Sequence, residues 1–131
     1  MSTAYAMYQD VILDHYKHPR NKGALDNATH RARESNPLCG DEIAIHLLVD
    51  GSDRIVEVRF EGQGCAISQA SASLLTLSVK GKTRGEASAM DRDDVLRSLG
   101  IPLSAVREAC ALLALQVLHR ALGPGREERT S

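Results

Sequence analysis

Residues 42–50 and 54–61 alternate between apolar and other residues, which is typical of strands that place one face on a core. The alternating apolar residues of the first stretch are Ile43, Ile45, Leu47 and Val49. Those of the second are Val56, Val58 and Phe60, with charged residues between them. The turn-forming sequence Asp50-Gly51-Ser52-Asp53 separates the stretches. We therefore predict an antiparallel hairpin whose second strand is broken by Gly62-Gln63-Gly64.

Other stretches carry apolar residues at the helical spacing of three and four. The first helix is predicted to place Tyr5, Tyr8, Ile12 and Tyr16 on one face and to stop before Pro19. A second helix is predicted over residues 66–80, with small residues in its first half. Two short helices are predicted after the capping sequence Thr83-Arg84-Gly85-Glu86 and after Asp91. The last helix, from about Ser104 to Leu122, is apolar enough that we expect it to be largely buried.

Residues 20–37 show no sustained periodicity and contain many polar groups, so we expect an ordered loop with room for one short edge strand. One hairpin followed by helices predicts an α+β domain in which the helices pack on one face of a small sheet. Residues 1–123 are expected to form a single domain, and residues 124–131 a flexible C-terminal tail.

Composition excludes several classes of function. The 131 residues hold 16 Lys and Arg against 17 Asp and Glu, so the chain is not built to neutralise many phosphates. Aromatic residues make up only 3% and Trp is absent, which argues against a stacking surface for single-stranded nucleic acid. No apolar run reaches 18 residues, and the N-terminus lacks the features of a secretory signal. We expect no nucleic-acid partner, no membrane contact and a cytoplasmic location.

Three cysteines, an odd number in a reducing compartment, do not indicate a disulfide framework. Cys39 and Asp41 precede the first strand of the hairpin, and Cys65 follows the second. Because a hairpin returns the chain to its starting end, these three residues should lie at one end of the sheet. Cys110 lies on the core-facing side of the last helix and could reach the same end. Three thiols and one carboxylate can complete a tetrahedral site for Zn²⁺ or for iron–sulfur chemistry.

The glycines beside the loop ligands, Gly40, Gly62 and Gly64, relieve crowding and permit unusual backbone angles. Packing is the alternative to a metal site, since an isolated cysteine often acts as a small buried apolar residue. That alternative suits Cys110, which lies between two alanines. From the residues alone the two interpretations carry equal weight. Cysteine–histidine catalysis is disfavoured, because no histidine lies near a cysteine in the sequence.

Four segments, in order along the chain, resemble the IscU/NifU N-terminal/SufU family of iron–sulfur cluster assembly proteins. They are Asp14-His15-Tyr16 with Pro19-Arg20-Asn21-Lys22-Gly23, then Asn36-Pro37-Leu38-Cys39-Gly40-Asp41, then Gly62-Gln63-Gly64-Cys65-Ala66-Ile67-Ser68, and Arg107 three residues before Cys110. The resemblance implies an α+β fold with a three-stranded antiparallel sheet. It also implies a scaffold, rather than an enzyme, that builds a transient [2Fe-2S] cluster. The sulfur would come from a PLP-dependent cysteine desulfurase, and the cluster would pass to apo-proteins.

The same resemblance assigns the cluster ligands to Cys39, Asp41, Cys65 and Cys110, with Zn²⁺ possible at the same site. Any of the three cysteines is then a candidate sulfur acceptor. Tyr8 matches a family tyrosine linked to assembly and self-association, so a monomer or weak homo-oligomer is expected. Arg107 matches a basic family position.

Departures from the family pattern keep a second function open. IscU-type members have a histidine directly before the last cysteine, where this chain has Ala109. SufU members also lack that histidine and act as zinc-dependent sulfur acceptors that stimulate a desulfurase, but they usually carry an insertion for which this chain has little room. Leu103-Ser104-Ala105-Val106-Arg107 lacks both prolines of the segment read by an Hsp70-type chaperone, so no such partner is expected. A structural zinc site in an adaptor domain is a third, minor hypothesis.

Overall fold

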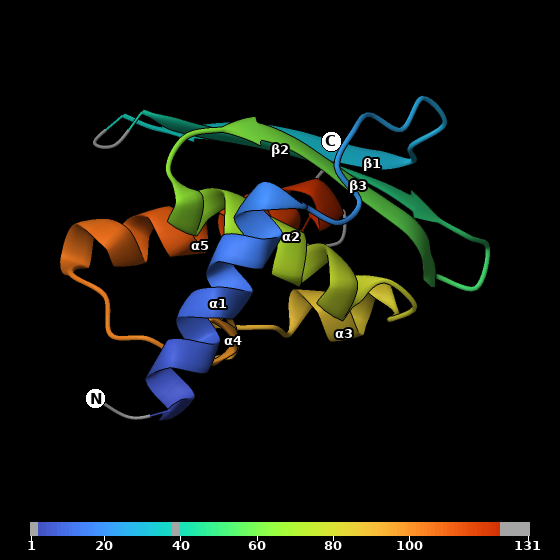
Figure 1. The fold of residues 1–131 in the computed structure, drawn as a ribbon. Helices are drawn as coiled ribbons and strands as arrows, with labels where there is room; N and C mark the ends of the chain where they lie inside the picture. The colour runs from blue at the N-terminus through green and yellow to red at the C-terminus, as the bar shows by residue number, and fades with distance from the viewer. Residues whose placement is uncertain (1–2, 38–39, 124–131) are drawn as a thin grey trace.

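The computed structural model describes the backbone of residues 3–37 and 40–123, and the side chains of these ranges from residue 9 onward. A three-stranded sheet forms one layer and the helices form the other, all on the same face of the sheet (Figure 1). The elements are α1 (Thr3–Lys17), β1 (His30–Asn36), β2 (Asp41–Val49), β3 (Ile55–Gln63), α2 (Ala66–Val79), α3 (Arg84–Ser88), α4 (Arg92–Leu99) and α5 (Ala105–Leu122). The predicted α+β class and the one-sided arrangement of the helices are confirmed. The predicted tail, residues 124–131, lies outside the described residues.

The sheet has the antiparallel order β1-β2-β3, so the predicted hairpin is confirmed. Its register pairs Glu42 at the start of β2 with Gln63 at the end of β3. On the other side of β2, Asp41 pairs with Asn36, the last residue of β1. The start of β2 therefore lies between the ends of the two other strands. This register brings the segments around Asp41 and Cys65 to the same edge.

β1 is a seven-residue strand, longer than the short edge strand for which the loop prediction left room. Its sequence HRARESN is polar because alternate residues face solvent and because the edge strand contributes little to the core. Ala32 packs against the core from this strand. A strand of this composition lacks the apolar alternation on which the sequence prediction relied.

Two features of β3 differ from the prediction. A β-bulge pairs Leu48 with Glu57 and Val49 with Ile55, so Val56 is the additional residue and lies 42% exposed. Ile55 occupies the core position that was predicted for Val56, on the buried face with Val58 and Phe60. The strand also continues through Gly62 to Gln63 instead of breaking there. A larger residue would not fit at position 62, because its Cβ would lie 2.7 Å from the carbonyl oxygen of Glu42. Glycine has no Cβ and so allows the strand to continue.

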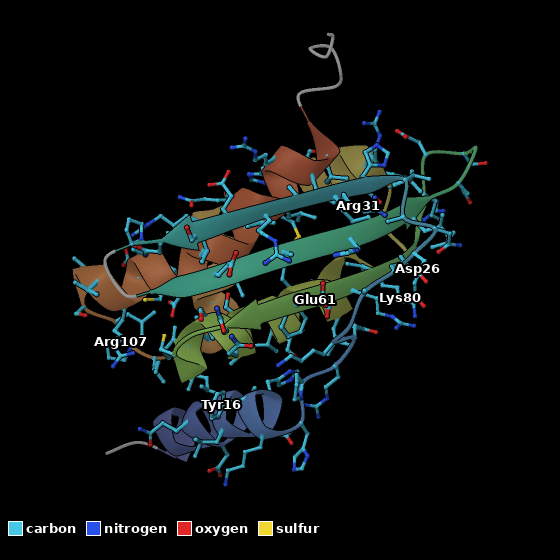
Figure 2. All side chains as sticks on the ribbon, turned by 90° about the horizontal axis from the view of Figure 1, so that it is seen from above. Tyr16, Asp26, Arg31, Glu61, Lys80 and Arg107 are labelled. Atoms are coloured by element: carbon cyan, nitrogen blue, oxygen red, sulfur yellow. The ribbon has the colours of Figure 1, made fainter. Side chains whose placement is uncertain are left out.

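Helix α1 presents a different face to the core than the tyrosine spacing predicted. Ile12 and His15 are buried, whereas Tyr16 is 46% exposed (Figure 2). His15 turns inward because its Nδ1 lies 2.7 Å from the hydroxyl oxygen of Ser73 on α2. The same hydroxyl accepts a hydrogen bond from the backbone N–H of Arg20 at 2.9 Å. A polar contact thus takes the place of the aromatic one that the sequence suggested.

One continuous apolar core fills the space between the sheet and the helices. The largest side chains that are fully buried in it come from both layers: Phe60, Ile43, Ile45, Leu47 and Ile55 from the sheet, and Leu99, Leu113, Leu118 and Leu122 from the helices. Helix α5 is buried along much of its length, as predicted, and the Ser104 hydroxyl caps it by accepting a hydrogen bond from the Arg107 N–H at 3.3 Å. Within the described residues, none of the helices combines the length and apolar character needed to cross a membrane.

Burial of His15 predicts a loss of stability in mild acid. Burial lowers the pKa of His15 below its ordinary value of 6.5, and the nearby Arg20 charge lowers it further. His15 then binds a proton at a higher pH in the unfolded chain than in the folded chain. The contribution of the neutral, buried imidazole to the free energy of unfolding is therefore full above about pH 6.5 and is lost as pH falls below it. We expect urea unfolding of the metal-free protein at pH 7.5 and 5.5 to show a smaller acid loss in His15→Gln than in the unmodified chain. His18→Gln, which changes an exposed histidine nearby, should retain the full loss. An equal loss in all three proteins would contradict this assignment.

Candidate metal centre

Asp41 is a fully buried carboxylate at the first position of β2. Its Oδ1 accepts a hydrogen bond from the backbone N–H of Cys65 at 2.8 Å. Cys65 is the N-cap residue of α2, and its own side chain makes no capping bond. The carboxylate of a neighbouring strand therefore partners a backbone donor at the start of this helix, where the helix dipole also favours negative charge.

The Cys65 thiol lies beside the same carboxylate, with Sγ 3.6 Å from Oδ2 of Asp41. Cys65 as a whole residue is half-buried, whereas Cys110 is buried. The turn that carries it contains Gly64 at φ +138°, where a Cβ would lie 2.0 Å from Oδ1 of Asp41. Glycine is required at this position on two grounds: the backbone angle and the close approach of the carboxylate.

Cys110 reaches this point from α5 and is buried. The ligand atoms of Asp41, Cys65 and Cys110 all lie within 4.8 Å of one another. Tetrahedral coordination with Zn–S bonds of about 2.3 Å places two sulfurs about 3.8 Å apart. The three donors thus need to close by only about 1 Å to hold such an ion. Two thiols and one carboxylate match the ligand chemistry of Zn²⁺ and of iron–sulfur centres.

The remaining predicted site residues differ in what the structure shows of them. Cys39 lies outside the described residues, as does the side chain of Tyr8. Gly40 has φ +71°, and its N–H donates to the carbonyl oxygen of Asn36 at 2.9 Å, which closes the connection between β1 and β2. Arg107 is exposed, three residues before Cys110 on α5, and lies at the end of the molecule where β1 connects to β2 (Figure 2).

Histidines take no part in the group of close ligands within the described ranges. Nδ1 of His46 accepts from the Leu25 N–H at 3.4 Å, and its Nε2 faces Glu61 at 3.4 Å. Nε2 of His119 lies 2.9 Å from the carbonyl oxygen of Met90. These contacts give both histidines partners outside the group formed by Asp41, Cys65 and Cys110.

Gln69 is a residue at this site that the sequence analysis did not identify. It is buried on the first turn of α2, and the neighbouring backbone donors assign the orientation of its amide. In that orientation the amide oxygen accepts from the backbone N–H of Gln63 at 3.0 Å and of Gly64 at 3.3 Å. The available signal was a long polar side chain in an otherwise small-residue segment, four positions after Cys65. Side chains on a helix point toward its N-terminus, so that spacing allows a glutamine to reach back to the preceding turn.

The chain is similar to known proteins along nearly its whole length. The chain is 36% identical to the zinc-dependent sulfurtransferase SufU of Bacillus subtilis, over 139 alignment positions that cover 93% of this chain and 92% of the relative. It is 33% identical to the iron–sulfur cluster assembly scaffold protein IscU of Escherichia coli, with 93% of this chain and 96% of the relative covered. A crystal structure from Fervidobacterium islandicum, described as an iron–sulfur cluster assembly scaffold protein for the SUF system, superimposes with a TM-score of 0.76. It is 32% identical and covers 91% of this chain and 98% of that one.

The first alignment spans 139 positions, more than the 131 residues of this chain, so the SufU relative carries residues that this chain lacks. The family profile of the NifU-like N-terminal domain matches residues 7–129. Most of the chain, including every segment around the candidate site, falls within that match. The protein is a member of the NifU-like N-terminal domain family, to which SufU-type and IscU-type relatives connect it.

Proposed function

We propose that this protein is an iron–sulfur cluster assembly scaffold, which receives sulfur and iron, builds a transient [2Fe-2S] cluster and passes it to apo-proteins. The observation that carries the proposal is the convergence of Asp41, Cys65 and Cys110, from three different elements, within 4.8 Å. Iron, sulfide and the cluster are cargo in this function. A half-buried thiol beside two buried ligands suits a site that both loads and releases.

Cys39 is the proposed fourth ligand. Two peptide units separate it from Asp41 in the sequence, which limits the distance between their Cα atoms to about 7 Å. With Cys39 included, the donor set becomes three thiolates and one carboxylate, the number that a tetrahedral ion needs. Zn²⁺ would be held by this same set and, when bound, would keep the thiols deprotonated and the site closed.

Sulfur would arrive as the persulfide of a cysteine desulfurase. A thiolate of this chain attacks the outer sulfur, forms the new S–S bond and leaves the desulfurase cysteine as a thiolate. Cys39, Cys65 and Cys110 are all candidates for this step. Of the two described cysteines, Cys65 is the more exposed. Asp41 is a harder ligand than thiolate and binds iron–sulfur clusters more weakly, which favours release to acceptor proteins.

A zinc-dependent sulfurtransferase of the SufU kind is the second candidate function. It is favoured by Ala109, which offers no histidine ligand beside Cys110, and by the similarity to SufU of Bacillus subtilis. It is disfavoured by the residues of that relative that this chain lacks. In this function the protein would stimulate a desulfurase by accepting its sulfur, and no cluster would be built.

A cysteine desulfurase and apo iron–sulfur acceptors are the proposed partners under the scaffold function, in the cytoplasm and without nucleic acid. Residues 1–123 are proposed to act as one domain, since a single cluster of buried apolar side chains includes residues from Ile12 in the first helix to Leu122 in the last. Arg107 is proposed as a supporting residue near the candidate metal centre, because it is exposed at the end of the molecule where β1 connects to β2.

One experiment separates the two functions. The purified protein is analysed for metal and then reconstituted anaerobically with iron and sulfide, with absorption followed from 300 to 700 nm. The zinc-loaded protein is assayed in parallel for stimulation of a cysteine desulfurase. A stable cluster spectrum without stimulation supports the scaffold, whereas strong stimulation without a cluster supports the sulfurtransferase. Absence of both would contradict the proposed site.

Replacement of the carboxylate should prolong the life of the cluster. We expect Asp41→Ala to transfer its reconstituted cluster to an apo-ferredoxin several-fold more slowly than the unmodified protein, because the weakest ligand is gone. Glu42→Ala is the matched control, since Glu42 is the adjacent acidic residue and pairs with Arg33 at 3.0 Å instead. Transfer by Asp41→Ala at an equal or higher rate would count against the role given to the carboxylate.

Gly64→Ala should disrupt the site more than the fold. The new Cβ would overlap Oδ1 of Asp41, so the carboxylate must move, and we expect Zn²⁺ affinity to fall at least tenfold. Gly81→Ala is the control, because Gly81 also has a positive φ, of +92°, but has no atoms within 4 Å of the added Cβ. Both variants should lose stability through backbone strain of roughly 1 kcal/mol or more. Competition with a chromophoric chelator measures the affinity, and equal affinities in the two variants would refute the expected displacement of Asp41.

A further inference from the structure

Helix α2 buries five polar side chains, and their partners lie on several different elements. The buried polar residues of this helix are Ser68, Gln69, Ser71, Ser73 and Thr76. Those of its second half contact the region after α1, where Ser73 accepts from the Arg20 N–H and Thr76 accepts from the Asn21 amide at 3.1 Å. Those of its first half contact the segments that carry the candidate ligands.

Gln69 and Asp41 share three successive backbone N–H groups at the turn between β3 and α2. The amide oxygen of Gln69 accepts from Gln63 and Gly64, at 3.0 and 3.3 Å. Oδ1 of Asp41 accepts from the next donor, the Cys65 N–H, at 2.8 Å. The turn is therefore held from two sides, by a helix side chain and by a strand side chain.

The turn transmits any shift directly to the candidate ligands. Gly64 approaches Asp41 so closely that even a Cβ would collide with the carboxylate, at 2.0 Å from Oδ1. The next residue is Cys65, whose Sγ lies 3.6 Å from Oδ2 of Asp41. A movement of the Gly64 backbone by a few tenths of an ångström would therefore change the distance between the Cys65 sulfur and the Asp41 carboxylate.

The same helix also contacts the backbone beside the third candidate ligand, Cys110. Ser71, two residues after Gln69, donates from its hydroxyl to the carbonyl oxygen of Ala111 at 2.6 Å. Ala111 directly follows Cys110 on α5. The first half of α2 is thus tied on one side to the turn before Cys65 and on the other to the backbone next to Cys110.

We propose that Gln69 is a positioning residue of the metal and cluster site, which holds the Gln63-Gly64 turn against α2 and so sets the spacing of Asp41 and Cys65. This inference rests on the proposed function of that site. Glutamine suits the task because a neutral amide supplies an acceptor without adding negative charge beside a carboxylate and thiolates. Its contribution reaches the ion through the turn and not by direct contact, as is typical of groups that orient metal ligands.

The test is Co²⁺ binding, because cobalt bound by thiolates gives charge-transfer bands near 350 nm and d–d bands whose intensity reports tetrahedral geometry. Gln69→Met removes the acceptor with little change in side-chain length or helix propensity. Gln69→Asn retains the amide but is one methylene shorter, so it should not reach the turn. Thr76→Val is the matched control, since it removes a buried polar contact of the same helix that faces Asn21 instead of the site. Unfolding midpoints of the metal-free proteins are measured alongside.

We expect both Gln69 variants to bind Co²⁺ about tenfold to hundredfold more weakly than the unmodified protein and with weaker d–d bands. Thr76→Val should keep the affinity and the spectrum whatever its unfolding midpoint. Unchanged affinity and spectrum in a folded Gln69 variant would overturn the inference, as would an equal loss in Thr76→Val at a matched midpoint. Failure of the unmodified protein to show thiolate–cobalt bands would instead refute the proposed function.

Discussion

The hydrogen bond from the Cys65 N–H to the buried carboxylate of Asp41 ties the start of helix α2 to the sheet at the candidate site. Its geometry depends on the register of the hairpin, which places the start of β2 beside the end of β3. It also depends on Gly64, because no other residue leaves room for the carboxylate at this turn. A hydrogen bond to a charged group contributes roughly 1.5–3 kcal/mol. The candidate site and the position of the first turn of α2 therefore depend on the same contact.

The small residues of α2 explain how so many polar groups are tolerated inside the molecule. Ala70 and Ala72 are fully buried and allow the helix to approach its neighbours closely. Close approach puts the Ser71 hydroxyl within reach of a backbone carbonyl on α5. Buried polar groups cost little when they are paired, and each such pair fixes one position of the neighbouring segment. An apolar helix of the same volume would fill the space but would not specify where the ligand-bearing turn lies.

Much of this arrangement could be predicted from the sequence because it follows from topology. A hairpin returns the chain to its starting end, so Asp41 and Cys65 had to lie near each other once the two strands were recognised. The periodicity of α5 placed Cys110 on its inner side for the same kind of reason. β1 was underestimated because an edge strand with a polar sequence lacks the alternation of a buried one. The bulge at Val56 had no signal, since Ile55 and Val56 are equally apolar and either could have faced the core.

The inward turn of His15 and the role of Gln69 were also beyond the sequence, and for a common reason. A polar side chain is placed by its partner, and the partners, Ser73 and the Gln63-Gly64 turn, lie on elements whose relative position periodicity does not determine. The spacing of apolar residues along the sequence indicates which face of a helix or strand is buried. The partner of a buried polar side chain leaves no such pattern in the sequence. The parts of the site that follow the chain's period were thus predictable, and the parts that depend on side-chain pairing required the structure.

Zinc K-edge X-ray absorption on the zinc-loaded protein tests most directly whether the proposed ligands meet at one ion. The account predicts a first shell of three sulfurs at about 2.3 Å and one oxygen at about 2.0–2.2 Å, with one zinc bound per chain. A shell with fewer than three sulfurs, or one that contains a histidine nitrogen, would contradict the convergence of Cys39, Asp41, Cys65 and Cys110 on which the proposed function depends.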